Sequence, residues 1–433
     1  LIYRIFPLYN SIFFLAYIVV KVLAALSLVL VYITHYEGGD MFSYYFSAVC
    51  TINLAFENFE NFLKVILETP GPHTLNLYTQ NTGIPPSDIM LNRFTQPTIF
   101  ITIPLVFLSM NSFLGTSVLT SILTGFAHWH LYKKLLSLFP GINPVVIMLF
   151  IFTLPNLIWT SGILKDAYMQ IALSILTITL IKMKYEGRWL SITVLISFLL
   201  SYYYIFMTRT YVAYALIPAI VFFFFFDLVR KVKPVWAGVL IYILFAGIFI
   251  GGAGMIIYEM GDLLWKYNPK TILEKIEEIR SDLVKDYYGG NHFDIGPVEP
   301  TITGVLEKFP IATISGIYRP FPWELRKPIM FPDVAFDTIL LILTFYFFLR
   351  VGLKHLLTDV FTNPVLLFML TYGILCAFAV GLTTPNFGAL VRFKSQYMPF
   401  IITVFLLSGA KYMLKNKSIQ ESELPAMGRV TTG

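Results

Sequence analysis

Long continuous runs of apolar residues, separated by polar connections, form the main pattern of this chain. A helix needs about 20 apolar residues to cross a bilayer, and the first run, residues 11–34, is long enough. The runs do not alternate between apolar and polar residues, so they predict helices rather than the strands of a membrane barrel. We therefore expect an all-α polytopic membrane protein with about ten transmembrane helices. The expected spans are residues 11–34, 97–132, 142–159, 162–182, 189–207, 210–227, 236–257, 333–350, 364–381 and 397–413.

The 97–132 run is the least regular of these spans. Asn111, Gly115 and Thr116 interrupt it, so it is either one broken crossing or a re-entrant segment. Lys21 lies inside the first span, where a charge facing lipid is costly. We expect its side chain to face protein or to extend to the membrane surface.

Two connections between spans are long, residues 35–96 and 258–332. Each contains a stripe of apolar residues at helical spacing among charged residues. The stripes are Phe59, Phe62, Leu63, Ile66 and Leu67 in the first connection, and Ile272, Ile276, Ile279, Leu283 and Val284 in the second. Both predict interfacial amphipathic helices that lie on the membrane surface.

The composition supports a membrane location and indicates an orientation. Hydrophobic residues make up 57% and charged residues 13% of the chain, whereas soluble domains carry about 25% charged residues. Lys and Arg gather in alternate short connections, which is typical of cytoplasmic loops. These loops account for the net charge of +6, so the charge gives no indication of a nucleic-acid partner. Both termini are then cytoplasmic and the two long connections are extracytoplasmic. We expect one transmembrane domain, 1–414, followed by a polar, disordered cytoplasmic tail, 415–433.

Asp40 is the first residue with candidate chemistry. It follows Gly38 and Gly39 shortly after the first span, on the extracytoplasmic side. A carboxylate beside a low-dielectric pocket can act as a general base on an acceptor hydroxyl, and the glycines let a substrate approach the backbone closely. The alternative is an ordinary turn acid, because Gly-Gly-Asp is a common loop composition. Glu37 is a second acid nearby.

Three cations lie where spans meet the same membrane face. Lys165 lies at the lip of one span, Arg209 lies in the short turn between two spans, and Arg392 precedes the last span. A charge at this depth is costly without an anionic partner, and the arginine fork suits phosphate. We predict that the three bind a donor phosphate, with anchoring to lipid headgroups as the alternative. Asp166 points to a different helix face from Lys165, so it needs a partner of its own.

An aromatic segment before the 333–350 span carries a further cation and acid. Arg319, Trp323 and Glu324 lie together there, and two prolines stiffen the backbone between them. Such a wall could hold a sugar ring, so these residues, with Asp166, are candidate sugar or acceptor contacts. The alternative is an interfacial segment closed by an Arg–Glu pair.

The sequence offers no motif for a metal or another cofactor. It lacks an Asp-x-Asp pair, a P-loop, a Ser–His–Asp order and a Cys-x-x-Cys motif. His128 and His130 are two residues apart, which is poor spacing for one metal site on a helix. We therefore expect neither a metal nor a cofactor.

Four of these segments together resemble bacterial multi-span glycosyltransferases of the GT-C type and the neighbouring polysaccharide polymerases. They are residues 38–40, 159–166, 319–324 and 386–394. The resemblance implies a polyprenyl-phosphate-linked sugar as donor, transfer to a protein or glycan acceptor outside the bacterial cytoplasmic (inner) membrane, and an acid in the first loop as base. On this chain that base would be Asp40, and Lys165, Arg209 and Arg392 would contact the donor phosphate. The chain departs from members of this type that carry a large C-terminal soluble domain or paired metal-binding acids.

Four functions follow from these observations. The first is inverting, metal-independent transfer of a sugar from a polyprenyl-phosphate carrier in the membrane lipids to an extracytoplasmic acceptor. The second is polymerisation of lipid-linked polysaccharide repeat units, in which the arginines would bind a diphosphate. A third is a transporter or flippase for a lipid-linked solute, although charges at one face and the lack of an internal repeat count against it. The fourth is a membrane subunit that only scaffolds a partner.

Overall fold

A computed structural model describes residues 2–231, 240, 244, 247, 272–285 and 291–423, and these residues form helices without a named strand. The helices are α1 (Ile2–Thr34), α2 (Asp40–Glu57), α3 (Phe59–Leu67), α4 (Pro72–Leu75), α5 (Ser87–Met90), α6 (Gln96–Leu108), α7 (Phe113–Leu138), α8 (Pro144–Met148), η1 (Leu149–Phe152), α9 (Leu154–Ile158), α10 (Lys165–Glu186), α11 (Ile192–Thr208), α12 (Thr210–Arg230), α15 (Ile272–Leu283), α16 (Ile302–Glu307), α17 (Phe309–Tyr318), η4 (Pro322–Glu324), η5 (Pro328–Met330), α18 (Phe331–Arg350), α19 (Leu353–Thr362), α20 (Pro364–Thr383), α21 (Phe387–Phe393), η6 (Lys394–Gln396) and α22 (Met398–Glu423). The prediction of an all-α fold is therefore confirmed for this part of the chain.

Six helices in the described residues are long and apolar enough to cross a membrane. They are Ile12–Thr34, Lys165–Glu186, Thr210–Arg230, Pro328–Arg350, Pro364–Thr383 and Met398–Asn416. Helices α6 and α7 would add one broken span, because they pass the same test as a pair but are bent by 113°. The interruption expected in 97–132 is thus present as a sharp bend. A multi-pass membrane protein is supported, and a count of about ten spans is not confirmed.

Three of the expected spans account for the difference in number. Residues 142–159 form α8, η1 and α9 instead of one crossing, because Pro144 and Pro155 lack the N–H that a helix interior needs and each lies in the first turn of a short helix. The 189–207 span corresponds to α11, which has 17 residues and belongs to the shorter apolar helices. The 236–257 span lies outside the continuously described residues.

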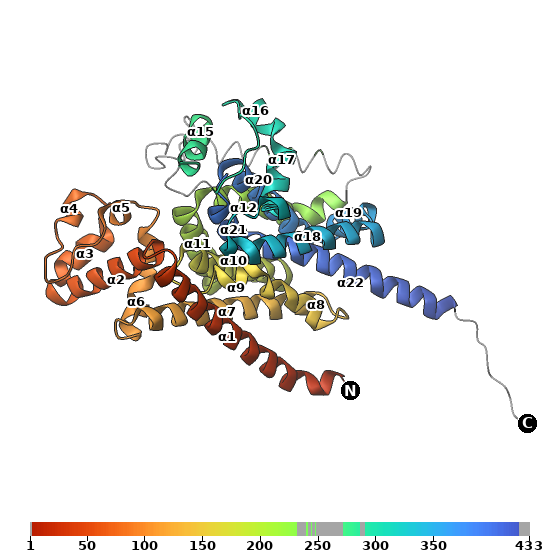
Figure 1. Cartoon of the computed structure of the whole chain (residues 1–433). Coiled ribbons are helices and arrows are strands. Elements are labelled where there is room, and N and C mark those ends of the chain that lie inside the picture. Colours follow the sequence, from red (N-terminus) through yellow and green to blue (C-terminus); the bar gives the residue numbers. More distant parts are fainter. Residues whose placement is uncertain are drawn as a thin grey trace, which may run out of the picture.

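The spanning helices pack around one main core, and a second group of helices lies beside it. Residues of α7, α10, α12, α20 and α22 contribute to the main core, whereas α2 to α6 share a smaller one. In Figure 1 helices α2 to α5 lie to one side of the bundle, and α15 and α16 lie above it. The two predicted amphipathic segments form helices: the stripe in the first long connection lies in α3, and that in the second lies in α15 up to Leu283.

A third, small core positions the polar residues described below. It joins α1, α2, α21 and the turn before α10 through Tyr32, Met41, Leu164 and Val391. Gly162 in that turn has Met41 and Leu28 so close that an added Cβ would lie 2.7 Å from the Met41 Cε. The glycine therefore permits the close approach that brings α1, α2 and α10 together.

Lys21 also fastens α1 to the turn before α10. Its ammonium is fully buried and donates hydrogen bonds to the Thr160 carbonyl at 2.8 Å, the Thr160 hydroxyl at 2.9 Å and the Ser161 hydroxyl at 2.7 Å. The expectation that Lys21 faces protein is confirmed.

The expected disordered tail is wrong in its first part. Helix α22 continues to Glu423, so residues 415–423 are helical, and residues 424–433 lie outside the described chain. The polar residues of 415–423 continue the hydrogen-bonded ladder of a long apolar helix, so they add residues to a helix that has already been nucleated.

Candidate functional site

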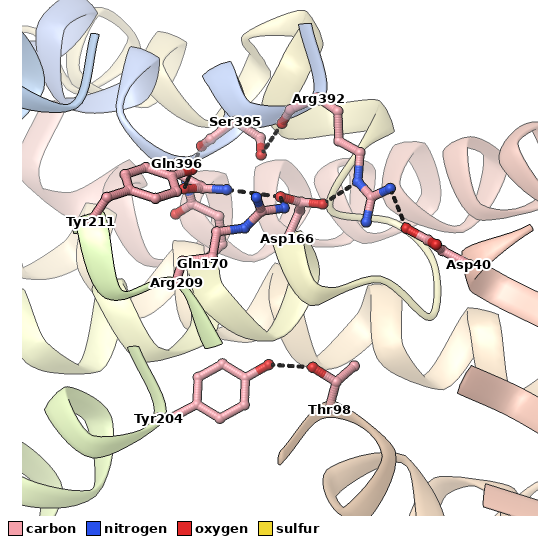
Figure 2. Close-up of polar contacts among 10 residues, drawn as sticks. All are labelled: Asp40, Thr98, Asp166, Gln170, Tyr204, Arg209, Tyr211, Arg392, Ser395 and Gln396. Atoms are coloured by element: carbon pink, nitrogen blue, oxygen red, sulfur yellow. Dashed lines mark hydrogen bonds and ion pairs between the residues drawn. The ribbon is translucent and has the colours of Figure 1, made fainter. Parts of the chain in front are cut away.

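Arg392 joins two acids that come from distant parts of the chain (Figure 2). Its Nη1 lies 2.6 Å from Oδ2 of Asp40, and its Nε lies 2.5 Å from Oδ2 of Asp166. Asp40 begins α2, Asp166 lies in the first turn of α10, and Arg392 lies in α21. One guanidinium thus holds together three segments at the end of the bundle where α1 and α20 finish and α10, α12, α18 and α22 begin. We refer to this end as the site end.

Asp166 is the fully buried centre of this cluster. Its Oδ1 accepts hydrogen bonds from Arg209 Nη2 at 2.7 Å and from Gln396 Nε2 at 2.9 Å, while its Oδ2 receives Arg392. Tyr211 in turn donates to Oε1 of Gln396 at 3.0 Å. A carboxylate in the first turn also benefits from the helix dipole. The two arginines and the amide thus compensate the cost of burying this charge.

Every residue of the short segment 392–396 makes a polar or cation–π contact, and Figure 2 shows those of Arg392, Ser395 and Gln396. The Phe393 ring lies 3.9 Å from the Arg209 guanidinium carbon, in a cation–π contact. Lys394 is fully buried, with its Nζ 2.7 Å from Asp337 Oδ2 and 2.6 Å from the Arg319 carbonyl oxygen. The Ser395 carbonyl accepts a hydrogen bond from Gln170. Arg392 therefore projects from a segment that has little freedom to move.

Asp40 differs from Asp166 in its exposure. It follows Gly38 at φ 145° and Gly39 at φ 87°, backbone conformations that favour glycine, and its side chain is 41% exposed. Burial raises the pKa of Asp40, but the charge and hydrogen bond of Arg392, with a further contribution from Lys165, outweigh it and hold the pKa below its ordinary value. Asp40 is therefore ionised at neutral pH.

The pKa values of Arg392 and Lys394 are shifted in opposite directions. Burial lowers the pKa of Arg392, but Asp166 and Asp40 outweigh this effect and raise the pKa well above its ordinary value. Burial also lowers the pKa of Lys394, and here the nearby Asp337 carboxylate only partly offsets the loss of hydration. Arg392 is thus a permanent cation for any anion that enters the site.

A cavity of about 910 Å³ opens beside the cluster. Its polar lining includes Asp40, Lys165, Arg209 and Arg392. Residues at helical spacing form one largely apolar wall: Tyr211, Ala215 and Pro218 on α12, and Leu375, Phe378, Ala379 and Leu382 on α20. Pro218 lies eight residues into α12, so this wall extends ~12 Å from the site end at 1.5 Å per residue. The cavity therefore suits a ligand with an anionic group and an apolar chain.

Helix α15 contributes a further wall of the same cavity. Its lining residues include Ile276 and Ile279 together with Glu278 and Asp282. Arg280 anchors the helix, because its buried guanidinium donates to the Leu382 carbonyl at the end of α20 at 3.0 Å. Helix α15 of the second long connection thus packs against the site and contributes both apolar and acidic groups to it.

The structure brings four of the eight residues selected from the sequence to this cavity and places the others elsewhere. Asp40, Lys165, Arg209 and Arg392 line it, whereas Asp166 lies buried behind the arginines. Arg319 lies 3.5 Å from Glu324 and packs on the Phe293 ring at 4.5 Å, outside the cavity lining. Trp323 is 77% exposed and stacks on Phe321. This aromatic segment connects to the cluster through the Arg319 carbonyl that accepts from Lys394.

Sequence reasoning missed several members of the polar network, among them Tyr211, Gln396 and Asp337. Tyr211 and Gln396 give no signal, because a Tyr or Gln at a span end is common. Asp337 did carry one, since it is an acid inside an apolar run, and such acids are rare without a partner. Its 2.7 Å contact with Lys394 supplies that partner.

Comparisons with known proteins add no relationship to this description. The chain matches no protein-family model, no curated protein and no solved structure. Among the residues that the structure describes, no group of three or more His, Cys, Asp and Glu side chains is arranged to hold a metal ion.

Proposed function

We propose that this protein is a membrane glycosyltransferase that moves a sugar from a polyprenyl-phosphate-linked donor to an extracytoplasmic acceptor. The observation that carries the proposal is the convergence of Asp40, Lys165, Arg209 and Arg392 from separate segments on one cavity with an apolar wall. An enzyme for this reaction needs cations for the donor phosphate, a base for the acceptor and an apolar surface for the carrier chain.

In the proposed complex the donor phosphate lies against the three cations. The arginine forks and the Lys165 ammonium stabilise the negative charge that develops on the departing phosphate. The carrier chain follows the apolar faces of α12 and α20, where Ala215 and Ala379 leave room in the wall. This arrangement uses the charged and the apolar part of the cavity together.

The transfer step needs one proton acceptor and one leaving group. Asp40 takes the proton of the acceptor hydroxyl while that oxygen forms a bond to the anomeric carbon. The bond between the anomeric carbon and the phosphate oxygen breaks, and the lipid phosphate leaves with the electron pair. A direct displacement of this kind inverts the anomeric configuration. A polymerase of lipid-linked repeat units would use the same cations for a diphosphate.

The proposal places the cavity at the extracytoplasmic face of the bacterial inner membrane and both termini in the cytoplasm. The distribution of charge supports this orientation. The basic residues Lys184 and Arg230 lie at the ends of α10 and α12 remote from the site end, and Lys and Arg are typical of cytoplasmic loops.

A reconstituted assay tests this function. The full chain in liposomes is supplied with short-chain polyprenyl phosphates that carry different hexoses, together with a glycan and protein acceptor extract. Mass spectrometry then measures the polyprenyl phosphate released. We expect release with at least one donor and a loss of about 10²–10⁴-fold in Asp40→Asn, the usual contribution of general base catalysis. Glu37→Gln, which removes an exposed acid three residues away, should leave release unchanged.

Two outcomes would contradict the proposal. One is the absence of release with every donor in a protein that retains its melting temperature. The other is equal release by wild type and Asp40→Asn, which would exclude Asp40 as the base. Movement of intact donor across the liposome membrane without release would favour a transporter.

A further inference from the structure

The two acids that bind Arg392 hold it in different ways. Asp166 is fully buried and receives Arg392 on one oxygen while Arg209 and Gln396 occupy the other. Asp40 lines the cavity, is 41% exposed, and meets Arg392 Nη1 through Oδ2 at 2.6 Å. The Asp166 contact therefore belongs to the buried framework, whereas the Asp40 contact can be reached from the cavity.

The guanidinium keeps its place without Asp40. Its Nε stays bound to Asp166, and the segment that carries it is fixed by the Lys394–Asp337 pair and the Phe393–Arg209 contact. Loss of the Asp40 contact would therefore free one face of an oriented cation. A free Nη edge facing a cavity is the geometry that binds a phosphate oxygen.

The backbone before Asp40 allows its carboxylate to move away from Arg392. It is the first residue of α2, and the preceding Gly38 and Gly39 adopt conformations accessible to glycine. The Gly38 N–H donates a hydrogen bond to the Tyr32 carbonyl at 3.3 Å, but an added Cβ on Gly38 would meet nothing within 4 Å, so the space on that side of the backbone is open. A change of the Asp40 side-chain rotamer would carry its carboxylate from Arg392 into the cavity.

We propose that Asp40 is an exchangeable partner of Arg392, which a phosphate group entering the cavity displaces. This inference rests on the proposed function and specifies its order of events. The donor phosphate takes the place of the Asp40 carboxylate at Arg392 Nη1, and Asp40 is released toward the acceptor hydroxyl. Before the donor binds, the same carboxylate is neutralised by the arginine and is a poor proton acceptor. The base thus becomes effective only when a donor is in place.

Binding of a simple amphiphilic anion tests the exchange without any transfer reaction. The probe is decyl methyl phosphate, a phosphodiester with one negative charge at neutral pH, titrated calorimetrically into the full chain in an uncharged detergent. If Asp40 competes for Arg392, then Asp40→Asn should bind the probe about 2- to 10-fold more tightly than wild type, the range expected for one partly exposed ion pair. Asp40→Glu, which keeps the charge, should bind more weakly than Asp40→Asn.

Glu37→Gln is the matched control. It removes a nearby negative charge from the same loop, and Glu37 is not part of the cavity lining. An equal gain in Glu37→Gln and Asp40→Asn would show a general effect of charge and overturn the exchange. Melting temperatures of the variants, measured in the same detergent, identify any variant that fails to fold.

The outcomes separate this inference from the proposed function. Tighter binding in Asp40→Asn alone supports exchange. Unchanged or weaker binding in Asp40→Asn, with clear binding in wild type, overturns the exchange and leaves the phosphate site in place. No binding of the probe by wild type or Asp40→Asn overturns both the exchange and the proposed function.

Discussion

Helices α10 and α12 are joined by an ion pair at each end, and the two ends differ in burial. At the site end, Arg209 Nη2 lies 2.7 Å from Asp166 Oδ1, and the acid is completely buried. At the opposite end, Lys184 Nζ lies 2.7 Å from Asp227 Oδ2; the lysine side chain is 10% exposed, close to the 9% of Arg209, but the acid side chain is 68% exposed. The distances are equal, so the geometry of the pair alone does not distinguish a site from an ordinary surface contact.

Burial gives the two pairs different consequences. A pair whose acid is exposed to water is worth about 0–1 kcal/mol, because water solvates the acid and screens its attraction to the cation. A buried charge that loses its partner has no such solvation, and the loss costs about 3–5 kcal/mol. The site end therefore depends on complete pairing around Asp166, whereas the opposite end does not depend on its pairs. The following predictions test this contrast, from the largest effect to the smallest.

Asp166→Asn should have the largest effect. It leaves Arg209 and Arg392 near an amide that cannot neutralise them, so we expect a loss of about 3–5 kcal/mol in the free energy of unfolding. Unfolding in detergent mixtures with increasing sodium dodecyl sulfate measures this quantity. A loss below about 1 kcal/mol would mean that water enters the cluster and that the site end resembles the opposite end.

Lys394→Met should follow closely, because it leaves Asp337 unpaired inside a spanning helix. We expect a loss of about 3 kcal/mol. The double variant Lys394→Met with Asp337→Leu removes both charges and should regain most of it, since an apolar pair needs no compensation. If the double variant is as unstable as the single one, the pair acts through its hydrogen bond to the Arg319 carbonyl instead.

Asp40→Asn should have a small effect that depends on pH. The pair is partly exposed, so we expect a loss of at most about 1 kcal/mol near neutral pH. The folded pKa of Asp40 is lowered by Arg392 and Lys165 and raised by Asp166 and burial, with a net decrease. A lowered folded pKa gives stability that is fully present above the unfolded pKa of about 3.9 and is lost as the pH falls through the folded pKa.

The difference in melting temperature between wild type and Asp40→Asn measures this effect. It should be constant from pH 5 to 8 and shrink below about pH 4. A difference that grows as the pH falls would have the wrong sign for a stabilising Asp40–Arg392 pair.

Asp227→Asn at the opposite end should have the smallest effect. The change is conservative and the side chain is mostly exposed, so we expect a change within about 0.5 kcal/mol. It is the matched control for Asp166→Asn, because both remove one acid from the same pair of helices. A loss comparable to that of Asp166→Asn would remove the distinction between the two ends.

The sequence identifies much of the fold because long apolar runs have few alternatives in a membrane. The run at 11–34 lies within α1, which begins earlier, at Ile2, and the run at 364–381 corresponds to α20, which ends at Thr383. The 142–159 run is also rich in apolar residues but contains Pro144 and Pro155, and the short helices there pack in the core. Hydrophobicity alone does not separate a crossing from a buried irregular segment.

The sequence predicted several residues of the candidate site but not which of them pair with one another. A charge at a span end needs a partner, and this rule selected Arg392, Arg209 and Lys165. The partner of Arg392 lies 226 residues away at Asp166, and no local pattern connects the two. Arg209 was expected at the membrane surface, yet it is buried under Phe393 because the segment before α22 folds over it.

Photoaffinity mapping tests the central claim most directly. The probe is an alkyl phosphodiester with a diazirine midway along its chain, bound to the full protein and activated in the presence or absence of excess polyprenyl phosphate. We expect labelled peptides from the 208–218 and 375–384 segments, where α12 and α20 line the cavity, and loss of this label under competition. Label confined to exposed lipid-facing positions such as Ile342, and unaffected by competition, would contradict a phosphate-lipid site in this cavity.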